Sequence, residues 1–315
     1  MLFGQNSGLP AYYRRTPGNI SDVTTLKTTI STLDFLGKTR LQFVLDQGFY
    51  SKKNVDTLLD NHYQFVLMLP TNRVWLRDIL DKYYQTIASP VHYQKTGEEG
   101  EALYMVSHPY MWGGHQCYVH LFYNATRAAE DFDNLTKKLI QCKDELETGC
   151  LCESNKVLYE RFFVVEKVST GVLVRYDEEA IVKFRQRYAG FFCLLTNNVV
   201  LDSCGLLEVY RRKDVVENCF DDLKNGLDMR RLRVHSSGVM DSRLFVQFLA
   251  LVLLSRVRMV VKQSKDLQYM TVREVMEAME CVVQITYSGR RGSTISETGP
   301  LQRKIIDTFN LVLET

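Results

Sequence analysis

The sequence predicts an α/β protein in which a mixed sheet is flanked by helices and interrupted by a β-rich (α+β) insertion. Three observations support this prediction. Short apolar runs alternate with helical patterns over residues 1–70. Short β-like runs around glycines, with one long helix, occupy residues 71–190. Apolar runs and helical patterns return over residues 191–262, and a helical segment, 263–315, closes the chain.

Within residues 1–70, apolar residues at helical spacing alternate with short apolar runs that are typical of strands. Apolar residues from Val23 to Leu36 recur at helical spacing, whereas residues 41–46 form a short continuous apolar run that ends in Asp46. Ser51 is placed to cap the helix that follows. The expected order is strand, helix, strand, helix, strand, at residues 9–16, 23–36, 41–46, 52–62 and 64–69.

Asp46 is the first candidate functional residue. As the last residue of a strand with covered faces, it would lie at the carboxyl end of that strand. Open α/β sheets bind their ligands in the crevice outside the carboxyl ends of the strands. We therefore expect Asp46 at the edge of the sheet where chemistry takes place.

The segment 71–190 has a different character. Glycines separate its β-like runs, and apolar residues from Ala128 to Leu146 follow one long amphipathic helix. We expect this segment to separate two parts of one core in sequence while the fold brings them together. The expected strands are 102–106, 116–123, 161–168 and 172–175, and a second helix covers 178–187.

The next landmark is a predicted continuous helix at residues 210–224, just after an apolar run at 191–197. Tyr210, Glu217 and Lys224 are spaced seven and seven, so their side chains would leave one face, with Lys213 one turn before Glu217. On spacing alone, the favoured interpretation is an exposed face with a Lys213–Glu217 pair, worth a few tenths of a kcal/mol. Beyond it we expect a buried helix around 244–254 and helices at 271–279 and 301–313.

Composition limits the partners. The 315 residues are 45% hydrophobic with a net charge of +2, so nucleic-acid contacts must rest on local basic patches. The N-terminus lacks a signal-peptide pattern. The apolar run 244–254 is shorter than the roughly 20 residues that span a bilayer, so we expect no membrane partner. The eight cysteines show no disulfide framework, which favours a cytoplasmic protein.

These landmarks resemble the DDE-type insertion-sequence transposases. That family carries a Tyr-x2-Arg-x3-Glu-x6-Lys signature, which stands here as Tyr210, Lys213, Glu217 and Lys224, with lysine in place of arginine. Lysine keeps the charge but loses the bidentate fork that suits phosphate. The family's Asp-x-Gly-(Phe/Tyr) motif stands as 46–49, and Tyr50, Ser51, Asn54 and the earlier Gly18, Asn19 and Asp22 extend the likeness.

The resemblance implies a ribonuclease H-like sheet and a two-metal Mg²⁺ site, with Asp46 and Glu217 as catalytic metal ligands. It also implies that Tyr210, Lys213 and Lys224 contact phosphates of the transposon end. The partners would be DNA, as transposon end and target, and a second copy of the chain or a full-length transposase. Phosphodiester cleavage fits two divalent ions held by carboxylates.

One part of the family's pattern is missing. The first catalytic aspartate of the family lies on a strand before the segments with which this sequence starts, and Asp22 matches a non-catalytic position better read as a helix cap. We therefore expect a C-terminal fragment of a transposase with an incomplete two-metal site. Such a chain would bind metal poorly and would not cut DNA unaided.

Several alternatives remain open at this point. Arg230, Arg231 and Arg233 could bind phosphates or only stabilise a helix end. His115, Cys117 and His120 form HxCx2H, but a strand would turn His120 to the other face, so a zinc site is disfavoured. Cys150 and Cys152 read as loop thiols. The alternative functions are a non-catalytic DNA-binding or inhibitory truncated transposase, and a ribonuclease H-like nuclease.

Overall fold

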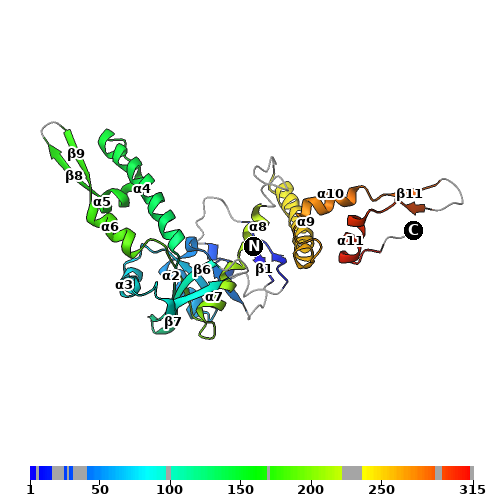
Figure 1. Cartoon of the computed structure of the whole chain (residues 1–315), viewed down its shortest axis with the longest axis horizontal. Helices are drawn as coiled ribbons and strands as arrows, with labels where there is room; N and C mark the ends of the chain where they lie inside the picture. Colours follow the sequence, from blue (N-terminus) through cyan, green and yellow to red (C-terminus); the bar gives the residue numbers. More distant parts are fainter. Residues whose placement is uncertain are drawn as a thin grey trace. The chain divides into compact units, whose positions relative to one another are not determined.

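The structure is a computed structural model that describes residues 1–4, 7–15, 25–26, 28–30, 41–96, 101–168, 171–221, 236–287 and 293–312 (Figure 1). The chain divides into two compact units. The larger unit is Thr16–Arg211, and the smaller unit joins Met1–Arg15 to Arg212–Thr315.

A mixed six-stranded sheet forms the centre of the larger unit. The strand order is β3-β4-β10-β7-β6-β5, and only β3 and β4 pair in parallel while the other described neighbours pair antiparallel. The α/β fold class is therefore confirmed, and it agrees with a ribonuclease H-like architecture. The strands are β3 (Gln42–Leu45), β4 (Gln64–Leu69), β5 (Tyr93–Thr96), β6 (Glu101–Trp112), β7 (His115–Tyr123) and β10 (Phe191–Thr196).

The β3-α2-β4 unit agrees with its predicted order. Ser51 caps α2 (Lys52–Asp60) by accepting from the Asn54 amide, and Val55 and Leu58 of this helix are fully buried. β4 is a continuous apolar run because both of its faces are covered, and Phe65 to Leu67 are inaccessible to solvent. The helix α3 (Val74–Tyr83) and the short helix η2 (Pro90–His92), which the sequence analysis did not anticipate, follow β4.

The sheet continues past the boundary expected at residue 70. The hairpin β6-β7 turns at Gly113 and Gly114, which both have positive φ, and residues 118–123 of β7 pair with β10. Leu121 of β7 is opposite Cys193 of β10 in this register, and both side chains are fully buried. The strands within residues 93–123 thus belong to the same sheet as β3 and β4.

A second apolar core lies within residues 125–188. Leu139 and Cys142 of the long helix α4 (Ala125–Thr148) pack with Phe162 and Val174, and Gly149 ends the helix in a left-handed conformation at φ 72°. The strand expected from residue 161 begins at Phe163, because 156–162 form a helix. The elements around this core, green in Figure 1, are η3 (Glu153–Asn155), α5 (Lys156–Phe162), β8 (Phe163–Val168), β9 (Gly171–Tyr176) and α6 (Glu178–Arg187).

The smaller unit combines the N-terminal hairpin with the C-terminal helices. Tyr13 packs its ring 4.8 Å from that of Phe248, and Arg15 forms an ion pair of 2.8 Å with Asp241. Residues 1–15 thus group with the C-terminal residues, and the domain bounds expected from the sequence stay a prediction. Its elements are β1 (Leu2–Phe3), β2 (Pro10–Tyr12), α8 (Asp214–Asp221), α9 (Ser237–Gln263), α10 (Val272–Glu280), β11 (Gln284–Thr286), β12 (Ser293–Ile295) and α11 (Pro300–Phe309).

The helix α9 differs from the short buried helix expected at 244–254. An 18-residue window within Gly238–Gln263 has a mean hydropathy of 2.0, and only 22% of that window is buried; Leu253 is 69% exposed. By length and composition alone this stretch could cross a membrane, a test that core helices of soluble proteins also pass. The expectation that this run is buried is therefore wrong for most of the helix, because its apolar residues extend around several faces.

Candidate functional site

The predicted continuous helix 210–224 is wrong. The chain forms α7 (Ser203–Arg211) and α8 (Asp214–Asp221), separated by a turn at Arg212 and Lys213. Tyr210 belongs to the larger unit, whereas the main chain of Glu217 belongs to the smaller one. The two residues therefore do not share one helix face.

The other predicted basic residues are not all described. Lys213 lies in the turn before α8, and its carbonyl accepts from the Val216 amide at 2.7 Å. The side chain of Glu217 lies outside the described part of the chain, as do Lys224, Arg230, Arg231, Arg233 and Asp22. Their proposed roles stay predictions.

Asp46 lies where the sequence places it, directly after β3, and its side chain is exposed. It caps the short helix η1 (Gln47–Phe49), because its Oδ1 accepts from the Gln47 amide at 2.8 Å. The buried Asn54 donates from Nδ2 to the Phe49 carbonyl at 2.8 Å. The residues that follow Asp46 in the motif thus build the loop that holds its carboxylate.

Tyr210, near the C-terminal end of the larger unit, contacts the same carboxylate. Its hydroxyl lies 3.1 Å from Oδ1 of Asp46 and 3.0 Å from Sδ of Met68 on β4. The ring is only 7% exposed because α7 packs its apolar face, which includes Leu206 and Leu207, against the sheet. Tyr210, the first residue of the signature, therefore lies beside Asp46.

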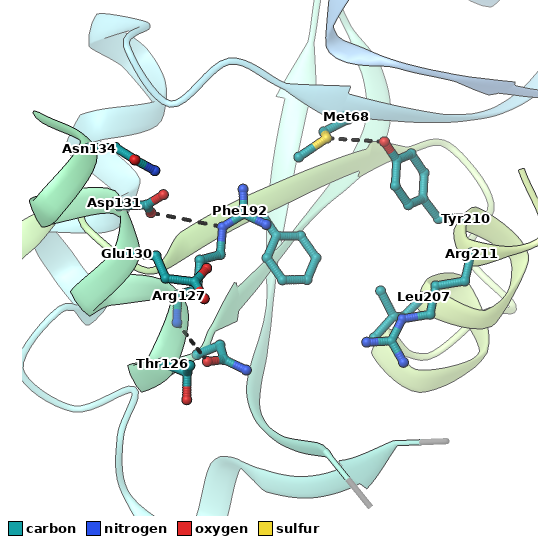
Figure 2. Close-up of a pocket in the computed structure, with 11 residues that line it drawn as sticks. Met68, Thr126, Arg127, Glu130, Asp131, Asn134, Phe192, Leu207, Tyr210 and Arg211 are labelled. Atoms are coloured by element: carbon teal, nitrogen blue, oxygen red, sulfur yellow. Dashed lines mark hydrogen bonds and ion pairs between the residues drawn. The ribbon is translucent and has the colours of Figure 1, made fainter. Parts of the chain in front are cut away.

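A cavity of about 560 Å³ opens beside Tyr210 (Figure 2). Its lining is mixed: Phe192 and Leu207 are apolar, and the polar residues include Arg127 and Asp131 of α4. Arg127 stacks over Phe192 with its guanidinium carbon 5.1 Å from the ring centre, and its Nε lies 3.8 Å from Asp131 Oδ2. This cavity lies between Tyr210 and α4, a helix that the sequence did not link to the site.

Two members of the HxCx2H motif, Cys117 and His120, are buried. His120 is 2% exposed, its Nδ1 lies 2.8 Å from the Ser203 hydroxyl at the start of α7, and burial lowers its pKa to about 4. Burial raises the pKa of the Cys117 thiol to about 11, so the thiolate that binds zinc is disfavoured. Among the described residues, no three His, Cys, Asp or Glu side chains are grouped to hold a metal.

The model of the Transposase DDE domain matches residues 1–253. The chain belongs to this family. The match spans the segments of Asp46, Tyr210 and Glu217. DDE transposases act on DNA and generally use divalent metal ions. A comparison with curated proteins finds no match.

An aromatic cluster beside the Asp46 loop of this DDE transposase was missed by the sequence analysis. Trp75 donates from Nε1 to the Tyr50 hydroxyl at 3.0 Å and packs 4.7 Å from the ring of Tyr110. The guanidinium of Arg73 lies over the Tyr50 ring at 5.2 Å. Only Tyr50 carried a sequence signal, because the other residues come from separate elements that meet in the fold.

Proposed function

We propose that this transposase uses Asp46 and Glu217 as carboxylate ligands of Mg²⁺ in cleaving and transferring DNA strands at the ends of an insertion sequence. The observation that carries the proposal is the position of Asp46. Its exposed carboxylate follows the parallel strand β3, where α/β sheets bind ligands, and two donors reach its Oδ1. Carboxylate oxygens are the ligands that Mg²⁺ prefers.

When bound, divalent ions at such a site activate the attacking water or 3′-hydroxyl and neutralise charge on the phosphate. The chain's own contribution is to present oxygen ligands in fixed orientation and to hold the DNA. The expectation that the two-metal site is incomplete stays a prediction. Cleavage of a transposon-end duplex by the purified 315-residue chain with Mg²⁺ would contradict it.

DNA contact is proposed for the basic residues around the glutamate helix. Cations that touch phosphates release counterions, so each lost contact reduces the salt dependence of binding by about one unit of slope. We expect alanine at Lys213, and separately at Lys224, to lower this slope on a duplex of any sequence. Arg230, Arg231 and Arg233 are proposed to add to the same surface. The proposed setting is the cytoplasm, with a second copy or a full-length transposase as protein partner.

The deciding experiment maps the metal site directly. Fe²⁺ with peroxide, bound in place of Mg²⁺, generates radicals that cut the polypeptide close to the ion. With enough Fe²⁺ to fill a site of the weak affinity expected above, we expect cuts around residue 46 and around residue 217, and we expect Asp46→Asn to remove both sets. Asp60→Asn, at an exposed carboxylate that ends α2, is the matched control and should leave the cuts unchanged.

Other outcomes separate the alternatives. Cuts around residue 46 without cuts around residue 217 would refute the shared carboxylate site. No localised cuts, together with intact binding of duplex DNA, would favour a non-catalytic DNA-binding protein.

A further inference from the structure

We propose that Tyr210 is a positioning residue for the carboxylate of Asp46, so that its hydroxyl orients a metal ligand. This inference rests on the proposed function, because it assumes that Asp46 binds the metal. It assigns to the tyrosine of the signature a role other than contact with a DNA phosphate.

Two donors from different elements reach one oxygen of the Asp46 carboxylate. Oδ1 of Asp46 accepts from the Gln47 amide at 2.8 Å and from the Tyr210 hydroxyl at 3.1 Å. The amide comes from the adjacent residue and moves with the loop. The hydroxyl comes from α7, so it fixes the carboxylate relative to the sheet. Two donors from different elements restrict rotation of the carboxylate about its Cβ–Cγ bond.

The hydroxyl proton of Tyr210 is donated to Asp46. The Tyr210 oxygen also lies 3.0 Å from Sδ of Met68, but a phenol has one proton to donate. A thioether is a weak acceptor, whereas an ionised carboxylate is a strong one. The proton is therefore directed to Asp46, and Met68 packs against the oxygen.

Packing holds the Tyr210 side chain in place. Tyr210 is 7% exposed and belongs to a core cluster with Val66, Leu206 and Leu207. The ring is already ordered by packing, so no further side-chain entropy is lost when its hydroxyl bonds to Asp46. Partners of this kind, which orient metal ligands without touching the metal, typically change metal affinity by about 10- to 100-fold.

The test measures metal binding without DNA. Mn²⁺ is the probe, and its dissociation constant is measured by electron paramagnetic resonance. Tyr210→Phe removes the hydroxyl and keeps the packed ring, and we expect Mn²⁺ to bind about 10-fold more weakly. The affinity for duplex DNA in the absence of metal should not change. Tryptophan emission confirms that the variant is folded, since both tryptophans of the chain lie in the larger unit.

Two controls isolate the hydroxyl. Tyr159→Phe removes another buried tyrosine hydroxyl of the same unit that donates to a carboxylate, Glu145, and should leave Mn²⁺ binding unchanged. Met68→Leu removes the sulfur contact and keeps the Asp46 contact, so it should also bind Mn²⁺ as the wild type does. A loss in Met68→Leu as large as that in Tyr210→Phe would overturn the argument about the proton.

The outcomes distinguish this inference from the proposed function. If Asp46→Asn does not weaken Mn²⁺ binding, the metal role of Asp46 is refuted. If Asp46→Asn abolishes binding while Tyr210→Phe stays within twofold of the wild type, only the positioning role is overturned. If Tyr210→Phe weakens DNA binding without metal and leaves Mn²⁺ binding intact, the hydroxyl serves DNA.

Discussion

Replacing Gly190 with alanine should destabilise the larger unit strongly. Gly190 joins α6 to β10 at φ +81°, a conformation that costs a residue with a side chain about 1–2 kcal/mol. A Cβ there would lie 2.6 Å from the Ala128 Cβ and 2.7 Å from the Asn124 carbonyl oxygen. The main-chain carbonyl cannot move aside cheaply, because it starts α4, and overpacking of this kind adds about 1–3 kcal/mol. We expect a total loss of about 2–5 kcal/mol.

The control for this prediction is Gly149→Ala. Gly149 has a similar φ of +72°, but nothing lies within 4 Å of a Cβ built there. This variant should lose only about 1–2 kcal/mol, and the gain from a stiffer unfolded chain cancels between the two variants. The difference therefore isolates the cost of crowding against Ala128 and Asn124.

The assay is urea unfolding followed by tryptophan emission. Trp75 and Trp112 are the two tryptophans of the chain, and both lie in the larger unit, so the signal reports this unit alone. Equal losses in Gly190→Ala and Gly149→Ala would refute the reasoning, because they would mean that the neighbours of Gly190 yield without cost.

Two further predictions concern ionisation and thiol access. Burial lowers the pKa of His120 to about 4, below the value of 6.5 expected in the unfolded chain. Between these two pH values the unfolded state binds more protons than the folded state. The free energy of unfolding therefore falls as the pH drops from about 6.5 to 4, by about 3 kcal/mol at most. His120→Asn should flatten this part of the urea-midpoint profile measured by tryptophan emission, and an unchanged slope would contradict the assignment. An aromatic disulfide reagent should rapidly modify the exposed thiols of Cys150, Cys152 and Cys281 in the native protein. Fast reaction at any buried thiol would contradict the described packing. The buried thiols are Cys117, Cys142, Cys193 and Cys219.

The sequence was sufficient for elements whose signals are local. The apolar run before Asp46, the capping serine at 51 and the helix Glu178–Arg187 were all predicted within a residue or two of where they lie. These features depend on periodicity, caps and turn residues, which act over a few positions along the chain. The loop of Asp46 belongs to the same class, since its Asn54 and Ser51 bonds span at most five residues.

The sequence-based prediction failed where contacts between distant residues determine the structure. Continuous good helix formers predicted one helix from Tyr210, yet the chain ends α7 at Arg211. Burial of Tyr210 against the sheet binds α7 to the larger unit, whereas Cys219 of α8 packs with Leu251 and Phe3 in the smaller one. A local propensity of a few tenths of a kcal/mol per residue is smaller than the gain from burying these side chains.

The sequence by itself determined the α/β class, the strand that precedes Asp46 and the likeness to DDE transposases, because each depends on residue types at short spacing. Only the tertiary structure decided that residues 93–123 complete the sheet and that the Tyr210 hydroxyl meets Asp46 across 164 positions. The physical reason is that β-pairing and core packing bring together residues whose separation along the chain carries no periodic signal.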